Sequence, residues 1–107
     1  MNNITDPLER IRHTNDRAIE SGENCQSVFV SLKDGQEASF YYSYLRANRR
    51  DGERLMLVHV SAMIAIYGPA ELLAEVHRLV SQQRLAGVRD WEEGLVVEIE
   101  WTEAMKD

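Results

Sequence analysis

Apolar residues recur with a period of about 3.6 in two segments of the chain, which predicts two amphipathic helices. The first is expected over residues 6–21, with Asp6 as its N-cap and Gly22 as its stop. The second is expected over residues 69–86, with a glycine-terminated end at Gly87. Its apolar stripe is the firmer one and consists of Leu72, Leu73, Val76, Leu79 and Val80.

Alternating apolar and polar residues predict a β-hairpin from residues 27–33 and 36–45. A three-residue loop ending at Gly35 would pair even-numbered residues with one another and collect the apolar side chains on one face. A two-residue loop would instead pair Val30 with Ser39. We therefore expect the longer loop, with Gly35 in a left-handed conformation. The apolar face would consist of Val28, Val30, Leu32, Ala38, Phe40, Tyr42 and Tyr44.

The second half of the chain contains further strand signals. Residues 46–52 are polar and predict a turn, and residues 53–60 predict a third strand. The apolar run 62–67 is either a fourth strand or a continuation of the third across a bend. Leu95–Trp101 alternates regularly and predicts the last strand.

The predicted order is therefore α-β-β-β(-β)-α-β, and the predicted fold is a single α+β domain over residues 1–107. We expect a mostly antiparallel sheet of four to five strands with two helices packed on one face. The two ends, 1–5 and 103–107, are expected to be flexible. Apolar residues also fall on the other face of the sheet, which favours a homodimer.

Composition supports one folded domain in a reducing compartment. The chain has 107 residues, of which 44% are hydrophobic and 28% charged, and it has a single cysteine, Cys25. One cysteine cannot form an intrachain disulfide, so packing must hold the fold together. The first residues lack the pattern of a signal peptide, and no apolar run reaches the ~20 residues of a membrane helix. We therefore expect a cytoplasmic protein without membrane contact.

Catalytic and metal-binding patterns are absent from the sequence. The three histidines, His13, His59 and His77, have no metal-ligand spacing, and a structural role is expected for them. Cys25 has no surrounding nucleophile motif, and the glycines occur singly, which excludes the common phosphate-binding loops. The sequence therefore predicts no enzyme, no cofactor and no metal site.

Acidic residues are concentrated near the C-terminus. Of the net charge of −6, residues 88–107 contribute −5, from seven acidic and two basic side chains. They include a loop with the sequence Asp90-Trp91-Glu92-Glu93. Tryptophan is enriched at the energetic centres of interfaces, and acidic strips match basic protein surfaces. We predict that Asp90, Trp91, Glu92 and Glu93 contact a partner protein, which could itself be a nucleic-acid-binding protein.

The segment 41–50 interleaves tyrosines with arginines, and we assign Arg46, Arg49 and Arg50 to the same predicted partner-binding set. Aromatic rings and guanidinium groups also suit single-stranded nucleic acid. Direct nucleic-acid binding is nevertheless not expected, because phosphate binding depends on accumulated positive potential and this chain is acidic.

These observations favour a non-catalytic, small acidic protein-binding domain that blocks a surface of a partner. In general character the chain resembles inhibitors and immunity proteins encoded by phages and mobile elements, and this likeness is one of type alone. Two alternatives stay open. One is a small enzyme or ligand-binding module with a pocket between helix 69–86 and the sheet, holding His59, His77 or Tyr44. The other is a nucleic-acid-binding module that uses Arg46, Arg49 and Arg50.

Overall fold

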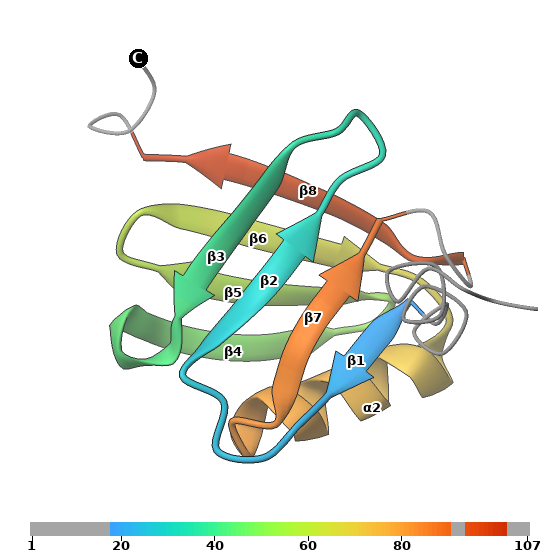
Figure 1. Ribbon diagram of the computed structural model, residues 1–107. Coiled ribbons are helices and arrows are strands. Elements are labelled where there is room, and N and C mark those ends of the chain that lie inside the picture. The colour runs from blue at the N-terminus through green and yellow to red at the C-terminus, as the bar shows by residue number, and fades with distance from the viewer. Residues whose placement is uncertain (1–17, 91–93, 103–107) are drawn as a thin grey trace, which may run out of the picture.

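A computed structural model describes residues 18–90 and 94–102, and β-strands are its main secondary structure (Figure 1). They form two four-stranded sheets. Sheet A has the order β1 (Ile19–Ser21), β7 (Leu85–Arg89), β2 (Ser27–Ser31) and β3 (Glu37–Tyr41). Sheet B has the order β4 (Leu45–Asp51), β5 (Arg54–His59), β6 (Ala62–Tyr67) and β8 (Val96–Trp101). Neighbouring strands are antiparallel except β2 and β7, so the expectation of an α+β fold with mostly antiparallel strands is confirmed.

The hairpin of β2 and β3 has the predicted register. Val28 pairs with Phe40 and Val30 with Ala38, and a three-residue loop ends at Gly35, whose φ is +97°. One part of the expectation is wrong, because the second strand stops at Tyr41 and a 3₁₀ turn, η1 (Tyr42–Tyr44), follows. This turn leads the chain from sheet A into sheet B, so Tyr44 is exposed and does not extend the apolar face.

The segment predicted as a polar turn, 46–52, is largely strand β4. It lies at an edge of sheet B, and its two faces meet different surroundings. Asn48 and Arg50 face the helix and hydrogen-bond to it, whereas Arg49 is exposed on the other side. An edge strand with one solvated face needs no apolar alternation, which is why its sequence resembles a turn.

Helix α2 (Ala70–Ser81) is shorter than the predicted 69–86, although all five residues of its predicted stripe are buried. The helix ends before Gln83, which has a left-handed φ of 55°, and the chain then forms β7. Gly87 is therefore not a helix cap but lies within that strand, between Glu20 of β1 and Phe29 of β2. A Cβ atom at this position would approach the Glu20 carboxylate to 3.4 Å and the Phe29 carbonyl oxygen to 3.5 Å.

The first predicted helix is wrong over its last residues, because Ile19–Ser21 form strand β1. Its earlier part, residues 6–17, lies outside the described residues, as do both segments expected to be flexible. Strand pairing with β7 overrides the helical period here, since Ile19 is buried opposite Val88. Among the described residues α2 is the single α-helix, where two were expected.

The two sheets pack face to face with their strands running steeply across one another (Figure 1). Helix α2 lies beside them at one open side, against β4, β5 and β7. The expectation of one sheet covered by two helices is thus wrong, because sheet A and not a pair of helices covers the apolar face of sheet B. The largest fully buried side chains are Phe40, Leu55, Leu57, Ile64, Ile66, Leu73, Leu85, Leu95, Val30, Val76 and Val88.

Trp101 joins the two sheets at one corner of the core. Its ring stacks on Phe40 of β3 at a centroid distance of 5.5 Å, and its indole N–H donates to the Gln36 side-chain oxygen at 3.4 Å. The run 62–67 is a separate strand, β6, paired with both β5 and β8. Val97 of β8 faces inward, while Glu98 and Glu100 face outward, as the alternation predicted.

Candidate protein-binding surface

The structure gives Asp90 a role within the fold. Its carboxylate accepts a hydrogen bond from the backbone N–H of Val97 at 2.9 Å and another from that of Lys33 at 3.1 Å. These contacts connect the end of β7 to β8 and to the β2–β3 loop. The other members of the predicted acidic site, Trp91, Glu92 and Glu93, lie outside the described residues.

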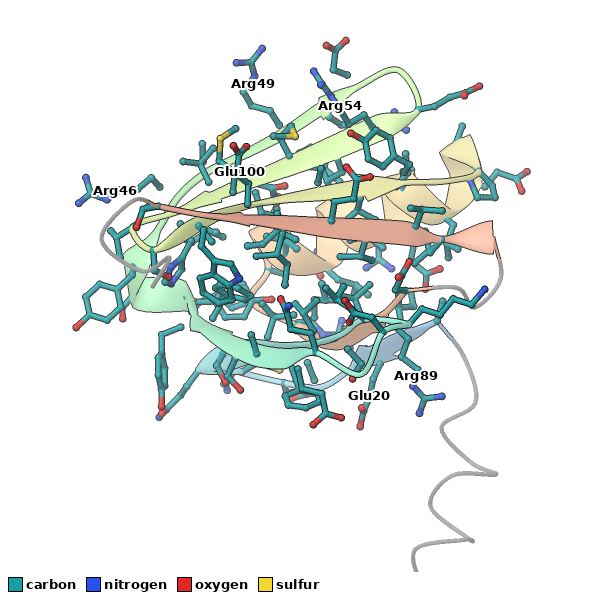
Figure 2. The ribbon with its side chains drawn as sticks, turned by 90° about the horizontal axis from the view of Figure 1, so that it is seen from above. Glu20, Arg46, Arg49, Arg54, Arg89 and Glu100 are labelled. Carbon is teal, nitrogen blue, oxygen red and sulfur yellow. The ribbon has the colours of Figure 1, made fainter. Side chains whose placement is uncertain are left out.

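The three arginines of the predicted site point to different surroundings. Arg49 lies on the outer face of sheet B (Figure 2). Arg50 faces inward, and its guanidinium donates to the Ala70 carbonyl at the start of α2 at 3.3 Å. Arg46 is exposed at an irregularity where β4 begins, at the opposite end of the fold from Asp90. Of the predicted residues that the structure describes, Arg46, Arg49, Arg50 and Asp90 therefore lie in separate surroundings.

Arg46 instead lies next to exposed apolar and aromatic side chains. Together with them it forms a surface that we term the tyrosine end. This surface consists of Tyr41, Tyr44, Arg46 and Val60, and each tyrosine is 54% exposed. Turn η1 places Tyr44 beside the β5–β6 turn, where the Val60 N–H donates to the Tyr44 carbonyl at 3.1 Å. Sequence analysis missed Tyr44 as a surface residue because it continued the strand past Tyr41.

A groove of about 1020 Å³ lies beside the tyrosine end. It lies between the β1–β2 loop, η1, the start of β4 and the C-terminal end of α2. Its walls are tied together, since the Cys25 N–H donates to the Gln83 carbonyl at 2.9 Å. The residues that line it are Asn24, Cys25, Gln26, Tyr41, Tyr42, Ser43, Leu45, Arg46, Ala47, Asn48, Val80, Ser81 and Gln83.

Two groove-lining residues are fixed by hydrogen bonds to neighbouring elements. The Tyr42 hydroxyl donates to the Leu85 carbonyl at 2.7 Å, and burial raises the pKa of this phenol to about 12. The Asn48 amide donates to the Ser81 hydroxyl at 3.0 Å and to the His77 carbonyl at 3.3 Å. These bonds leave little freedom to either side chain, so the groove is formed before any ligand arrives.

The two described histidines, His59 and His77, both contact neighbouring backbone groups. His59 is 8% exposed, and its Nδ1 accepts a hydrogen bond from the Ser61 N–H at 3.1 Å. Burial lowers its pKa, and the Tyr41 carbonyl only partly offsets that effect. His77 lies within 3.3 Å of the Asn48 carbonyl through its Nε2.

The groove differs from the pocket considered in the alternative hypothesis. It lies between the helix and β4, but His59, His77 and Tyr44 are not among its lining residues. Across residues 18–90 and 94–102, no three metal-ligating side chains form a cluster. Within the same residues no helix is long and apolar enough to cross a bilayer.

Comparison with known proteins assigns no relative to this chain. No protein-family model matches it, and no curated protein or solved structure gives a significant match. Interpretation of the tyrosine end and its groove therefore depends on their geometry and chemistry.

Proposed function

We propose that this chain is a non-catalytic protein-binding domain that blocks a surface of a partner protein through its tyrosine end and the adjoining groove. The observation that carries the proposal is the grouping of two half-exposed tyrosines with Arg46 at the mouth of a 1020 Å³ groove. Tyrosine and arginine are the residue types most enriched, with tryptophan, where protein interfaces gain their affinity.

The chemistry of the surface favours a protein segment over a small ligand. Its groove reaches the upper end of the roughly 300–1,000 Å³ typical of small-molecule pockets. Amide and hydroxyl groups from Asn24, Gln26, Ser43 and Ser81 line it, and these groups can satisfy the peptide groups of an inserted loop or extended chain. Arg46 adds one positive charge, which favours an acidic residue on the partner.

Preorganisation supports an inhibitory or immunity-type role. Tyr42 and Asn48 are hydrogen-bonded in place, so a partner would not have to order them when it binds. Smaller ordering costs leave more of the contact energy as affinity, which a blocking protein requires. The dispersal of Arg46, Arg49 and Arg50 over separate surroundings favours this interpretation over nucleic-acid binding.

The test is affinity capture from a native lysate with the full chain as bait, with and without nuclease. We expect one protein in near-stoichiometric amount under both conditions, and we expect Tyr41→Ser combined with Arg46→Glu to lose it. Val96→Ser is the matched control, because Val96 is 48% exposed and lies at the end of sheet B opposite Arg46, away from the tyrosine end.

Either of two results would contradict the proposal. If the double variant captures the partner as well as the control variant does, the binding site does not lie at the tyrosine end. Captured material that nuclease removes would favour the nucleic-acid hypothesis.

A further inference from the structure

The outer face of sheet B has an apolar centre that no described element covers. It lies opposite the face that packs on sheet A, and its middle strands, β5 and β6, supply most of its apolar side chains. Met63 is exposed, and the apolar side chains around it are partly exposed. Soluble monomers rarely leave a large contiguous apolar patch open to solvent. The apolar residues of this face are Ala47, Met56, Val58, Met63, Ala65, Tyr67 and Val96.

At the β4 edge of this face Asp51 pairs with Arg54 at 3.6 Å, and Arg49 adds a positive charge, whereas Glu98 and Glu100 lie at the β8 edge. Arg49 of β4 and Glu98 of β8 occupy the same row across the sheet, with Met56 and Ala65 between them. Three strand spacings of ~4.8 Å place the two edges about 14 Å apart, so the two charged groups lie at opposite sides of the apolar centre. Figure 2 shows Arg49, Arg54 and Glu100 on this face, with Glu20 and Arg89 on the outer face of sheet A.

We propose that a second copy of this chain covers the face, related by a two-fold axis that runs parallel to the strands between β5 and β6. Rotation about such an axis places β4 of one copy over β8 of the other. Arg49 then faces Glu98 of the second copy, and Glu98 faces its Arg49. The same contact therefore forms twice, as a two-fold interface requires.

The apolar residues fit the same arrangement. A hollow of about 570 Å³ on this face is lined by Met56, Met63, Ala65, Tyr67 and Glu98, among others, and Ala65 has the smallest of these side chains. Rotation about the proposed axis places Met56 of the second copy opposite Ala65. A long flexible side chain thus meets a hollow in each half of the interface.

The other simple axis is disfavoured by charge. An axis running across the strands along the row of Arg49 would place Arg49 over Arg49 and Glu98 over Glu98. It would also place Ala65 over Ala65 and leave the hollow unfilled. Charge and shape therefore select the axis parallel to the strands.

The size of the face predicts a weak dimer. Four strands at ~4.8 Å and six residues at ~3.4 Å give a footprint of roughly 20 Å by 20 Å for each copy. An area of this size lies at the low end for specific interfaces, so we expect a dissociation constant in the micromolar range. This interface is separate from the tyrosine end and does not depend on the function proposed above.

Sedimentation velocity over a concentration series tests the proposal with two charge reversals. We expect the unmodified chain to dimerise as concentration rises, and we expect Arg49→Glu alone and Glu98→Arg alone to weaken dimerisation at least about tenfold. An equimolar mixture of the two variants should dimerise again, because the mixed dimer has one unchanged Arg49–Glu98 contact and one in which the two charges are exchanged. Glu20→Arg and Arg89→Glu, on sheet A, are the matched controls and should leave dimerisation unchanged.

Three outcomes would overturn the proposal. The unmodified chain could stay monomeric at all concentrations, or both single variants could dimerise normally. Failure of the mixture to recover would exclude the proposed axis.

Discussion

The Tyr42 hydroxyl connects two elements through a single buried atom. Tyr42 directly follows β3 in the chain, and its hydroxyl donates a hydrogen bond to the Leu85 carbonyl of β7 at 2.7 Å. Tyr42→Phe keeps the ring but leaves that buried carbonyl without its donor, so we expect unfolding to become easier by about 1–2 kcal/mol. Urea denaturation measures the change, with Tyr41→Phe as the control because the Tyr41 side chain is exposed. Equal stability of the two variants would contradict the prediction.

His59 predicts a pH dependence of stability on the acidic side. Its pKa lies below the ordinary value of 6.5 in the folded chain because burial disfavours the charged ring. The unfolded chain therefore takes up a proton first as the pH falls through 6.5. The free energy of unfolding should be independent of this group above that pH and should fall below it.

The matched variant for this measurement is His59→Asn. An asparagine oxygen can accept the Ser61 N–H bond that Nδ1 accepts now, while it removes the titrating group. Denaturant unfolding of both proteins between about pH 7.5 and pH 5 should show a steeper loss for the unmodified chain. Parallel curves would show that another group controls stability in this range.

At the scale of elements, Asp90 holds β8 in place against the end of β7. Asp90→Ala would leave the backbone N–H groups of Val97 and Lys33 without their acceptor. We expect a loss of about 1–3 kcal/mol in unfolding free energy, partly reduced where water replaces the exposed Lys33 bond. Amide hydrogen exchange should increase at Val97 more than at Val30 in the core of sheet A. An Asp90→Ala variant of unchanged stability would return this residue to the candidates for partner contact.

The elements that sequence predicted well are those with one buried and one exposed face. Val28, Val30 and Phe40 alternate with polar residues, and one glycine fixes the turn, so both strands and their register could be derived. The last strand, which the sequence predicts over Leu95–Trp101 and the structure has as β8 over Val96–Trp101, follows the same rule. In these elements the local period and the tertiary environment require the same pattern.

The missed elements are those whose pairing is decided by distant parts of the chain. Strand β4 is polar because one side meets solvent and the other meets α2 through Asn48 and Arg50. Strand β7 contains Gly87, which a local reading takes as a helix end. Tertiary packing overrides local preference in both cases.

The candidate surface was only partly predictable for the same reason. Segment 41–50 drew attention by its tyrosines and arginines, and Arg46 and Tyr41 do lie at the proposed surface. The direction of each side chain depends on η1 and on the irregularity at the start of β4. Neither feature has a local sequence pattern from which it could be predicted. Arg49 and Arg50 consequently point to opposite sides of one strand.

At the scale of the whole molecule, the proposed dimer has a defined polarity. A two-fold axis parallel to the strands keeps the same strand ends on the same side. Arg46 and Val60 lie at one end of sheet B, so both tyrosine ends would point in one direction. Two copies of a partner segment could then be engaged at once, which raises the effective concentration of the second contact.

The parallel pairing of β2 with β7 has a consequence for how the chain folds. Strand β7 lies between β1 and β2, and Phe29 pairs with Gly87 although most of the chain separates them (Figure 1). Strands β4, β5 and β6 are consecutive neighbours and can assemble through local turns. Loop closure costs more entropy for distant segments, so sheet B should begin to form first and sheet A should complete last. During synthesis, β1 and the β2–β3 hairpin therefore cannot be joined by β7 until residues 85–89 have emerged.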